Sequence, residues 1–183
     1  MKNFLKIADN VGVMPLLVDI ARQPELWKED TYLRDYPQGP FGDVETIFLR
    51  FPPDSVTEME RDARDQHESI NRVEQRYLPH ARPMFMNLLA AVQGERIGRV
   101  MINKLKPGGR IFPHADTPAH AEYWDRFHIC LQGGPGSLFR CGDETVCMRP
   151  GEVWWFQNLI EHEVTNNSTD DRIHMIVDVR LMQ

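Results

Sequence analysis

The pattern of hydrophobic and polar positions divides the 183-residue chain into two unlike halves near Gly94. In the first half, apolar residues at helical spacing predict a helix over 15–27, which Pro24 is expected to break or restart. Residues 44–51 have the pattern of a strand and end at Pro52-Pro53, and residues 83–94 predict a helix that begins with Pro and ends with Gly. In the second half we expect eight short strands, over 96–105, 111–114, 126–131, 137–141, 144–148, 153–156, 162–165 and 172–179.

Turn residues rich in Gly, Pro and Asn separate these eight strands, and such a series is typical of a double-sheet jelly roll. The sequence therefore predicts a mainly β, cupin-like fold with flanking helices. We expect a single domain over 1–183, because domains usually have about 100–200 residues. Residues 96–180 would form the catalytic β core. Residues 1–95 would support it and supply the substrate side.

Charge and hydropathy exclude several classes of partner. The formal net charge of −6 argues against a nucleic-acid or anionic-membrane partner. No apolar run approaches the ~18–20 residues that a membrane helix needs. The first nine residues are charged too often for a secretory signal, so we expect a cytoplasmic protein.

The cysteines, Cys130, Cys141 and Cys147, are odd in number and form no CxxC motif. A hairpin that turns at Gly142-Asp143 would place Cys141 opposite Glu144. Cys147 would then lie three rungs away, ~10 Å by strand rise, beyond the ~7 Å limit for a disulfide. We therefore expect free thiols, which fits a cytosolic protein.

His114 and Asp116 are two residues apart, and on an extended chain such residues point to the same side. Taken alone, the pair is more typical of a surface contact than of a metal site. A third ligand would change this, and His162 is the best candidate because it opens a later strand after a turn. Two imidazoles and one carboxylate leave three positions open on an ion, as in the non-haem Fe(II) oxygenases.

Two strands place cationic side chains opposite an apolar face. Arg126 and His128 lie opposite Phe127 and Ile129, so they face either solvent or the lumen of a small barrel, where a buried arginine needs an anion. In the last strand, Arg172 lies opposite a continuous apolar face. If that side lines the cavity of His162, its planar guanidinium suits a carboxylate that is bound through both oxygens.

Several short motifs occur in a specific order: Pro107-Gly108-Gly109, Pro113-His114-Ala115-Asp116, Arg126-Phe127-His128, Arg140-Cys141-Gly142-Asp143, Glu161-His162-Glu163-Val164, Asp171-Arg172 and Val177-Asp178-Val179. In that order and spacing, residues 97–180 resemble the aspartyl/asparaginyl β-hydroxylase family of Fe(II)/2-oxoglutarate dioxygenases. The resemblance implies a double-stranded β-helix in which His114, Asp116 and His162 are the iron ligands.

By the same resemblance, Arg172 would hold the distal carboxylate of 2-oxoglutarate, and Arg126 and His128 would lie at its metal-chelating end. Asn103 stands where some relatives have a serine near the distal carboxylate. The implied reaction consumes O2, hydroxylates a C–H bond and releases succinate and CO2. The implied substrate is an amino acid, an amino-acid-like small molecule or an Asp- or Asn-type peptide residue, and we favour a small molecule or a single peptide residue.

Two other functions remain open at this point. Gly151, His162 and Asn166 fall at the spacing of a second cupin motif, so a cupin-type metalloprotein with a different chemistry is one alternative. The other is a module that binds 2-oxoglutarate without turnover. Two arginines suited to a diacid argue against the first, and the intact His-Asp-His set argues against the second.

Residues 54–68 carry six acidic residues and two arginines. This segment is either a solvated loop or helix, or a mobile lid at the cavity mouth. The pattern gives no indication of the oligomeric state.

Overall fold

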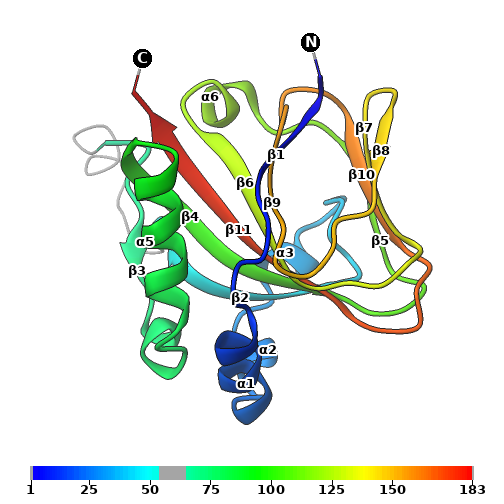
Figure 1. The fold of residues 1–183 in the computed structure, drawn as a ribbon, viewed down its shortest axis with the longest axis horizontal. Helices are drawn as coiled ribbons and strands as arrows, with labels where there is room; N and C mark the ends of the chain where they lie inside the picture. Colours follow the sequence, from blue (N-terminus) through cyan, green and yellow to red (C-terminus); the bar gives the residue numbers. More distant parts are fainter. Residues whose placement is uncertain (1, 54–64, 183) are drawn as a thin grey trace.

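Two antiparallel β-sheets face each other in the computed structural model, which describes residues 2–53 and 65–182 (Figure 1). Within those residues the larger sheet has seven strands in the order β1-β9-β6-β11-β4-β2-β3. These are β1 Phe4–Ala8, β2 Val44–Phe51, β3 Ile70–Asn71, β4 Gly94–Leu105, β6 Asp125–Gln132, β9 Val153–Phe156 and β11 Arg172–Leu181. The smaller sheet has the order β5-β10-β7-β8, with β5 Arg110–His114, β7 Ser137–Cys141, β8 Glu144–Val146 and β10 His162–Asn166.

The predicted strands are confirmed, and β4 to β11 pass between the two sheets as a double-stranded β-helix. β8 ends at Val146, two residues before the predicted end. Cys141 faces Glu144 across the β7–β8 hairpin, as predicted, and all three cysteines are free. An apolar cluster that includes Leu105, Phe139 and Phe156 packs between the sheets and joins them.

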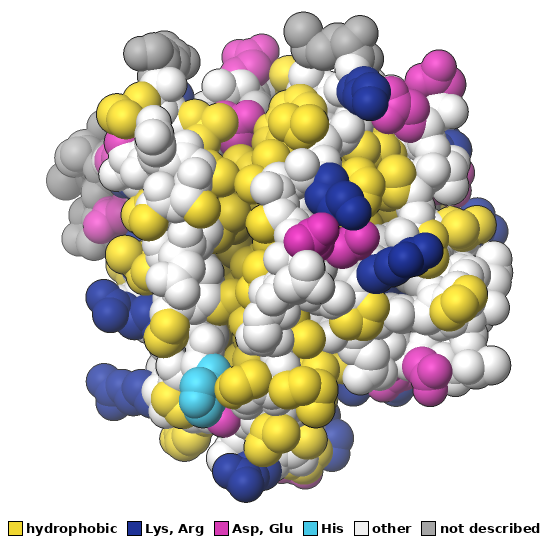
Figure 2. Space-filling model, in the orientation of Figure 1, with side chains coloured by type: hydrophobic (Ala, Val, Ile, Leu, Met, Phe, Trp, Pro, Cys, Tyr) yellow, Lys and Arg dark blue, Asp and Glu magenta, His cyan; other side chains and the backbone are white. Residues whose placement is uncertain are grey.

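Helices α1 Met14–Arg22, α2 Leu26–Glu29 and α5 Ala81–Ala91 pack on the outer face of the larger sheet. Three further short elements complete the described chain: α3 Tyr32–Asp35, the 3₁₀ helix η1 Val73–Tyr77 and α6 Pro118–Ala121. The apolar sides of β6 and β11, which carry Ile129 and Met175, form a core with α1, α2 and α5. Hydrophobic side chains remain visible between α5 and β1 on the face drawn in Figure 2.

The helices differ from the prediction at their ends. The break at Pro24 is confirmed, because α1 ends at Arg22 and α2 begins at Leu26. α5 begins two residues before Pro83, where the Asp19 carboxylate of α1 accepts hydrogen bonds from the backbone N and the Nδ1 of His80, at 3.1 and 2.8 Å. This contact joins distant residues, so the local pattern could not reveal it. No helix in the described part of the chain is long and apolar enough to cross a membrane.

Strand β1 was missed from the sequence. It pairs with β9, where Phe4 lies opposite Phe156, and so extends the edge of the larger sheet (Figure 1). Lys6 at its centre breaks the apolar run. Phe4 is nonetheless buried and packs edge-on against Phe139 of the smaller sheet, with ring centroids 5.2 Å apart. β1 therefore helps to hold the two sheets together.

We expect Phe4→Ala to lower the free energy of unfolding by about 3–5 kcal/mol, because it leaves a cavity between the sheets. Leu5→Ala is the matched control, since Leu5 is 54% exposed and should change stability by less than about 0.5 kcal/mol. Chemical denaturation followed by fluorescence measures both values. Equal effects of the two substitutions would contradict a structural role for β1.

Candidate metal centre and cavity

His114, Asp116 and His162 meet at one end of the smaller sheet. His114 ends β5, His162 begins β10, and the two residues are paired across these neighbouring strands. Asp116 follows β5 by two residues. One ligand atom from each residue lies within 4.8 Å of the other two, so one metal ion could contact all three.

Backbone carbonyls set the orientation of both imidazoles. The Nδ1 of His114 lies 2.8 Å from the carbonyl O of Phe112, and the Nδ1 of His162 lies 2.9 Å from that of Ile160. A carbonyl only accepts, so each Nδ1 carries the proton and each Nε2 keeps a lone pair for a metal. Burial lowers the pKa of His162 to about 4, an effect that the Ile160 carbonyl opposes and nearby His114 reinforces. His162 is therefore neutral near pH 7, as a metal ligand must be.

The third residue, Asp116, is held through only one of its carboxylate oxygens. Its Oδ2 accepts hydrogen bonds from Arg126 Nη1 at 2.7 Å and from Asn158 Nδ2 at 3.1 Å. The Asp116 backbone N also donates to the Asn158 carbonyl at 3.1 Å. These contacts fix the carboxylate and leave Oδ1 available to a metal ion.

Arg126 links Asp116 to a second buried acid, Asp178 of β11. Its Nε and Nη2 donate to the two oxygens of Asp178 at 2.7 and 3.0 Å, and His120 Nε2 of α6 lies 2.8 Å from Asp178 Oδ2. Burial disfavours both charges, but the facing charges outweigh it, so the pKa of Arg126 is raised and that of Asp178 is lowered. Of the two sequence alternatives for Arg126, the interior position is confirmed.

The other residues expected at a cofactor lie side by side on the inner face of the larger sheet. The cross-strand register places Asn103 beside His174, and the sides of β6 and β11 that carry His128 and Arg172 face inward. Arg172 is only 2% exposed, and among the described residues it meets no carboxylate. Burial lowers its pKa to about 10, so it remains charged near pH 7.

A chain of polar contacts leads inward from Arg172. Its Nη2 donates to His174 Nδ1 at 3.1 Å, and because a guanidinium only donates, this Nδ1 is the acceptor. His128 Nδ1 lies 3.4 Å from the same atom and therefore carries the proton of that contact. Burial and the charge of Arg172 keep the pKa of both histidines well below its usual value. Asn103, in the same row, accepts a hydrogen bond from Thr46 Oγ1 at 3.1 Å.

Sequence reasoning missed Asp178, His120 and Asn158 as site residues. Asp178 carried a signal, because it is an acid on the same side of the last strand as Arg172, within an otherwise apolar run. His120 and Asn158 lie outside the strands, where no periodicity applies.

A cavity of about 960 Å³ opens onto His114 and Asp116. Its lining also includes Arg99, His120, Arg126 and Thr117, and a wall of Tyr32, Tyr36, Phe41 and Phe51. Much of this wall comes from residues 32–53, within the half expected to supply the substrate side. Arg172, His128 and Asn103 lie outside its lining. Residues 54–64 of the acidic segment, expected to be either a solvated loop or helix or a mobile lid, lie outside the described residues. Asp65 pairs with Arg96, and His67 stacks on Tyr123.

The chain is similar in sequence to known hydroxylases. Residues 65–181, more than half of the chain, match the family model described as aspartyl/asparaginyl beta-hydroxylase. The human aspartyl/asparaginyl beta-hydroxylase is 32% identical over 87 residues, which cover 47% of this chain and 11% of the human protein. The match thus spans about a tenth of the length of that curated relative.

Solved structures support the fold. An oxidoreductase of the 2OG-Fe(II) oxygenase family from Burkholderia pseudomallei aligns with a TM-score of 0.54 and 16% identity over 94% of this chain and 92% of its own. The viral collagen prolyl hydroxylase of Paramecium Bursaria Chlorella virus-1 aligns with a TM-score of 0.55 and 13% identity over 99% and 97% of the two chains. At such low identity these likenesses concern the fold alone.

We expect Asp178→Asn to weaken Fe(II) binding by about 10–100-fold, the usual cost of losing a residue that orients a metal ligand. The substitution removes the charge that fixes Arg126, and Arg126 in turn holds Asp116. Asp125→Asn is the matched control, because Asp125 bonds Trp155 outside this network, through Oδ1 at 2.8 Å. Anaerobic titration of the metal-free proteins with Fe(II) measures the affinities. Equal affinity in wild type and Asp178→Asn would show that the network does not position the ligand.

Proposed function

Since the chain belongs to the aspartyl/asparaginyl β-hydroxylase family, we propose that it is an Fe(II)- and 2-oxoglutarate-dependent dioxygenase that hydroxylates a C–H bond of an amino acid, an amino-acid-like small molecule or an Asp- or Asn-type peptide residue. The observation that carries the proposal is the convergence of His114, Asp116 and His162, of which His114 and Asp116 line the cavity. Each offers one free ligand atom, and the set matches the two-histidine, one-carboxylate arrangement of non-haem Fe(II) oxygenases.

The residues present also fit 2-oxoglutarate. A guanidinium that is almost fully buried without a carboxylate is costly unless an anion reaches it. Arg172 is such a group, and its planar fork suits a carboxylate bound through both oxygens. We assign Arg172 to the distal carboxylate of 2-oxoglutarate, with Asn103 beside it and His128 toward the metal-chelating end. Arg126, expected at the same end, is already bound to Asp116 and Asp178, so we assign it first to holding the metal ligand.

When bound, iron and 2-oxoglutarate would supply the oxidising chemistry, with O2 as oxidant and succinate and CO2 as products. The chain itself would orient the reactants and exclude water. His114, Asp116 and His162 would hold the iron. The cavity wall around Asp116 would hold the substrate beside it. His128 and His174, buried and neutral, would add no charge beside the bound cofactor.

The two alternatives from the sequence predict different binding. A cupin-type metalloprotein of another chemistry does not need an unpaired buried arginine such as Arg172. A module that holds 2-oxoglutarate without turnover does not need an open side on the metal or a 960 Å³ cavity beside it. The arrangement therefore favours the dioxygenase over both.

We expect the iron-loaded protein to convert 2-oxoglutarate to succinate only with O2, slowly alone and faster with a substrate from a panel of amino acids and peptides. The measurement is succinate release in air and under nitrogen, and His162→Ala, which removes one ligand, is the matched variant and should lose both iron and activity. Binding of 2-oxoglutarate without succinate from any substrate would favour the binding module, and no binding would favour the cupin alternative.

We expect Arg172→Met to weaken 2-oxoglutarate binding by about two to three and a half orders of magnitude. Removing one partner of a buried charge pair costs about 3–5 kcal/mol, and each 1.4 kcal/mol is tenfold in affinity. Arg172→Lys should lose less, because the charge remains without the two-pronged geometry. Both variants should keep iron. Anaerobic titration of 2-oxoglutarate, followed by the visible charge-transfer band, tests this, and an Arg172→Met affinity within threefold of wild type would require another anchor.

A further inference from the structure

One guanidinium in the cavity has no carboxylate of the described residues within ion-pair distance. Arg99 of β4 lines the cavity and is half-buried, yet among the described residues it has no ion pair or side-chain hydrogen bond. Its guanidinium carbon lies 5.2 Å from the ring centroid of Phe51. Arg126, in the same lining, is fully engaged by Asp116 and Asp178. Among the described lining residues, Arg99 is therefore the cation that the cavity offers to a ligand.

Aromatic rings lead away from Arg99 along the cavity wall. Tyr32 lies between Phe51 and Tyr36, with ring centroids 6.1 and 5.9 Å away. Tyr32 and Tyr36 are 54% and 57% exposed, although both rings line a concave surface. Exposed aromatic side chains in a concave site are typical of a surface that a ligand covers.

The volume of the cavity and the charge of the site narrow the class of ligand further. The cavity is near the upper end of the roughly 300–1,000 Å³ range of small-molecule sites, so it holds a body larger than a single short side chain. With the proposed Fe(II) and 2-oxoglutarate bound, the positive charges of Arg99, Arg126, Arg172 and the metal exceed by one the negative charges of Asp116, Asp178 and the cofactor. One further negative charge would balance the site.

On the basis of the proposed function, we propose that the substrate is a carboxylic acid with an apolar or aromatic body, whose carboxylate is bound by Arg99. The body lies against Tyr32, Tyr36 and Phe51, on the wall supplied by residues 32–53. Arg99 and His114 line the same cavity, so a molecule anchored at Arg99 presents its body beside the proposed iron. Arg99 is in this account a residue that sets substrate specificity.

The test compares acids with their uncharged amides. The probes are 3-phenylpropanoate, indole-3-propanoate and N-acetylphenylalanine, each with its primary amide, titrated by calorimetry under nitrogen into protein loaded with Fe(II) and 2-oxoglutarate, and into the metal-free protein. We expect each acid to bind wild type at least tenfold more tightly than its amide. Arg99→Met should reduce that preference to less than twofold, and Arg99→Lys should give an intermediate value.

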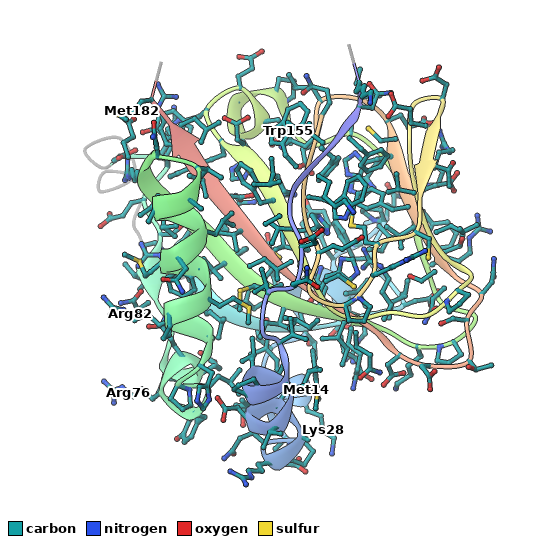
Figure 3. The ribbon with its side chains drawn as sticks, in the orientation of Figure 1. Met14, Lys28, Arg76, Arg82, Trp155 and Met182 are labelled. Atoms are coloured by element: carbon teal, nitrogen blue, oxygen red, sulfur yellow. The ribbon has the colours of Figure 1, made fainter. Side chains whose placement is uncertain are left out.

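Two further variants control the result. Arg76→Met replaces an exposed arginine of η1, on the outer side of the molecule (Figure 3), and should keep the full preference for acids. Tyr32→Ala should weaken acids and amides alike, because it removes part of the wall and no charge. Tyr32 is exposed, so this variant remains informative even if Arg99→Met does not fold.

The inference is overturned if wild type binds acids and amides equally, if no acid binds at millimolar concentration, or if Arg99→Met keeps the preference. Unchanged affinities in Tyr32→Ala would overturn the placement of the body. Titration of 2-oxoglutarate into the same iron-loaded samples separates the two proposals. Normal cofactor binding without a preference for acids contradicts the substrate alone, whereas absence of cofactor binding contradicts the proposed dioxygenase.

Discussion

A buried guanidinium held between two carboxylates organises the centre of this molecule. Arg126 joins β6 to β11 through Asp178 and to the loop after β5 through Asp116. His120 of α6 bonds the same Asp178, so the helix beside the cavity is part of the network. Removal of one partner from such a buried pair costs about 3–5 kcal/mol, because the other charge stays desolvated. The network therefore gives the Asp116 loop one favoured position, and with it the third proposed metal ligand.

The state of pairing distinguishes three arginines that all face the space between or beside the sheets. Arg126 is already paired with Asp116 and Asp178, so its role is structural. Arg172 is almost fully buried and, among the described residues, contacts the neutral His174 and the Phe139 ring but no acid, which leaves its charge for a bound anion. Arg99 is half-buried at the cavity wall and also has no acid of the described residues within ion-pair distance. Two unpaired cations at different depths suit two anionic ligands, a deep cofactor and a shallower substrate.

Local patterns were sufficient for the strands and for the direction of several side chains. In β11, Arg172 and His174 are polar and alternate with apolar residues such as Met175. Because successive side chains of a strand point to opposite sides, both lie on the side away from the helices. The His114–Asp116 spacing likewise placed two candidate ligands together. Two other contacts between distant elements were missed. The pairing of Phe4 with Phe156, and the reach of Arg126 to both Asp116 and Asp178, depend on sheet register that no single segment encodes.

The central claim is that Arg126 serves the metal ligand before it serves the cofactor. A crystal structure of the protein with Fe(II) and 2-oxoglutarate, grown under nitrogen, tests it most directly. We expect iron on His114 Nε2, His162 Nε2 and Asp116 Oδ1, with Arg126 still donating to Asp116 Oδ2 and the distal carboxylate of 2-oxoglutarate on Arg172. Iron bound elsewhere, or an Arg126 side chain that has left Asp116 for a cofactor carboxylate, would contradict the account.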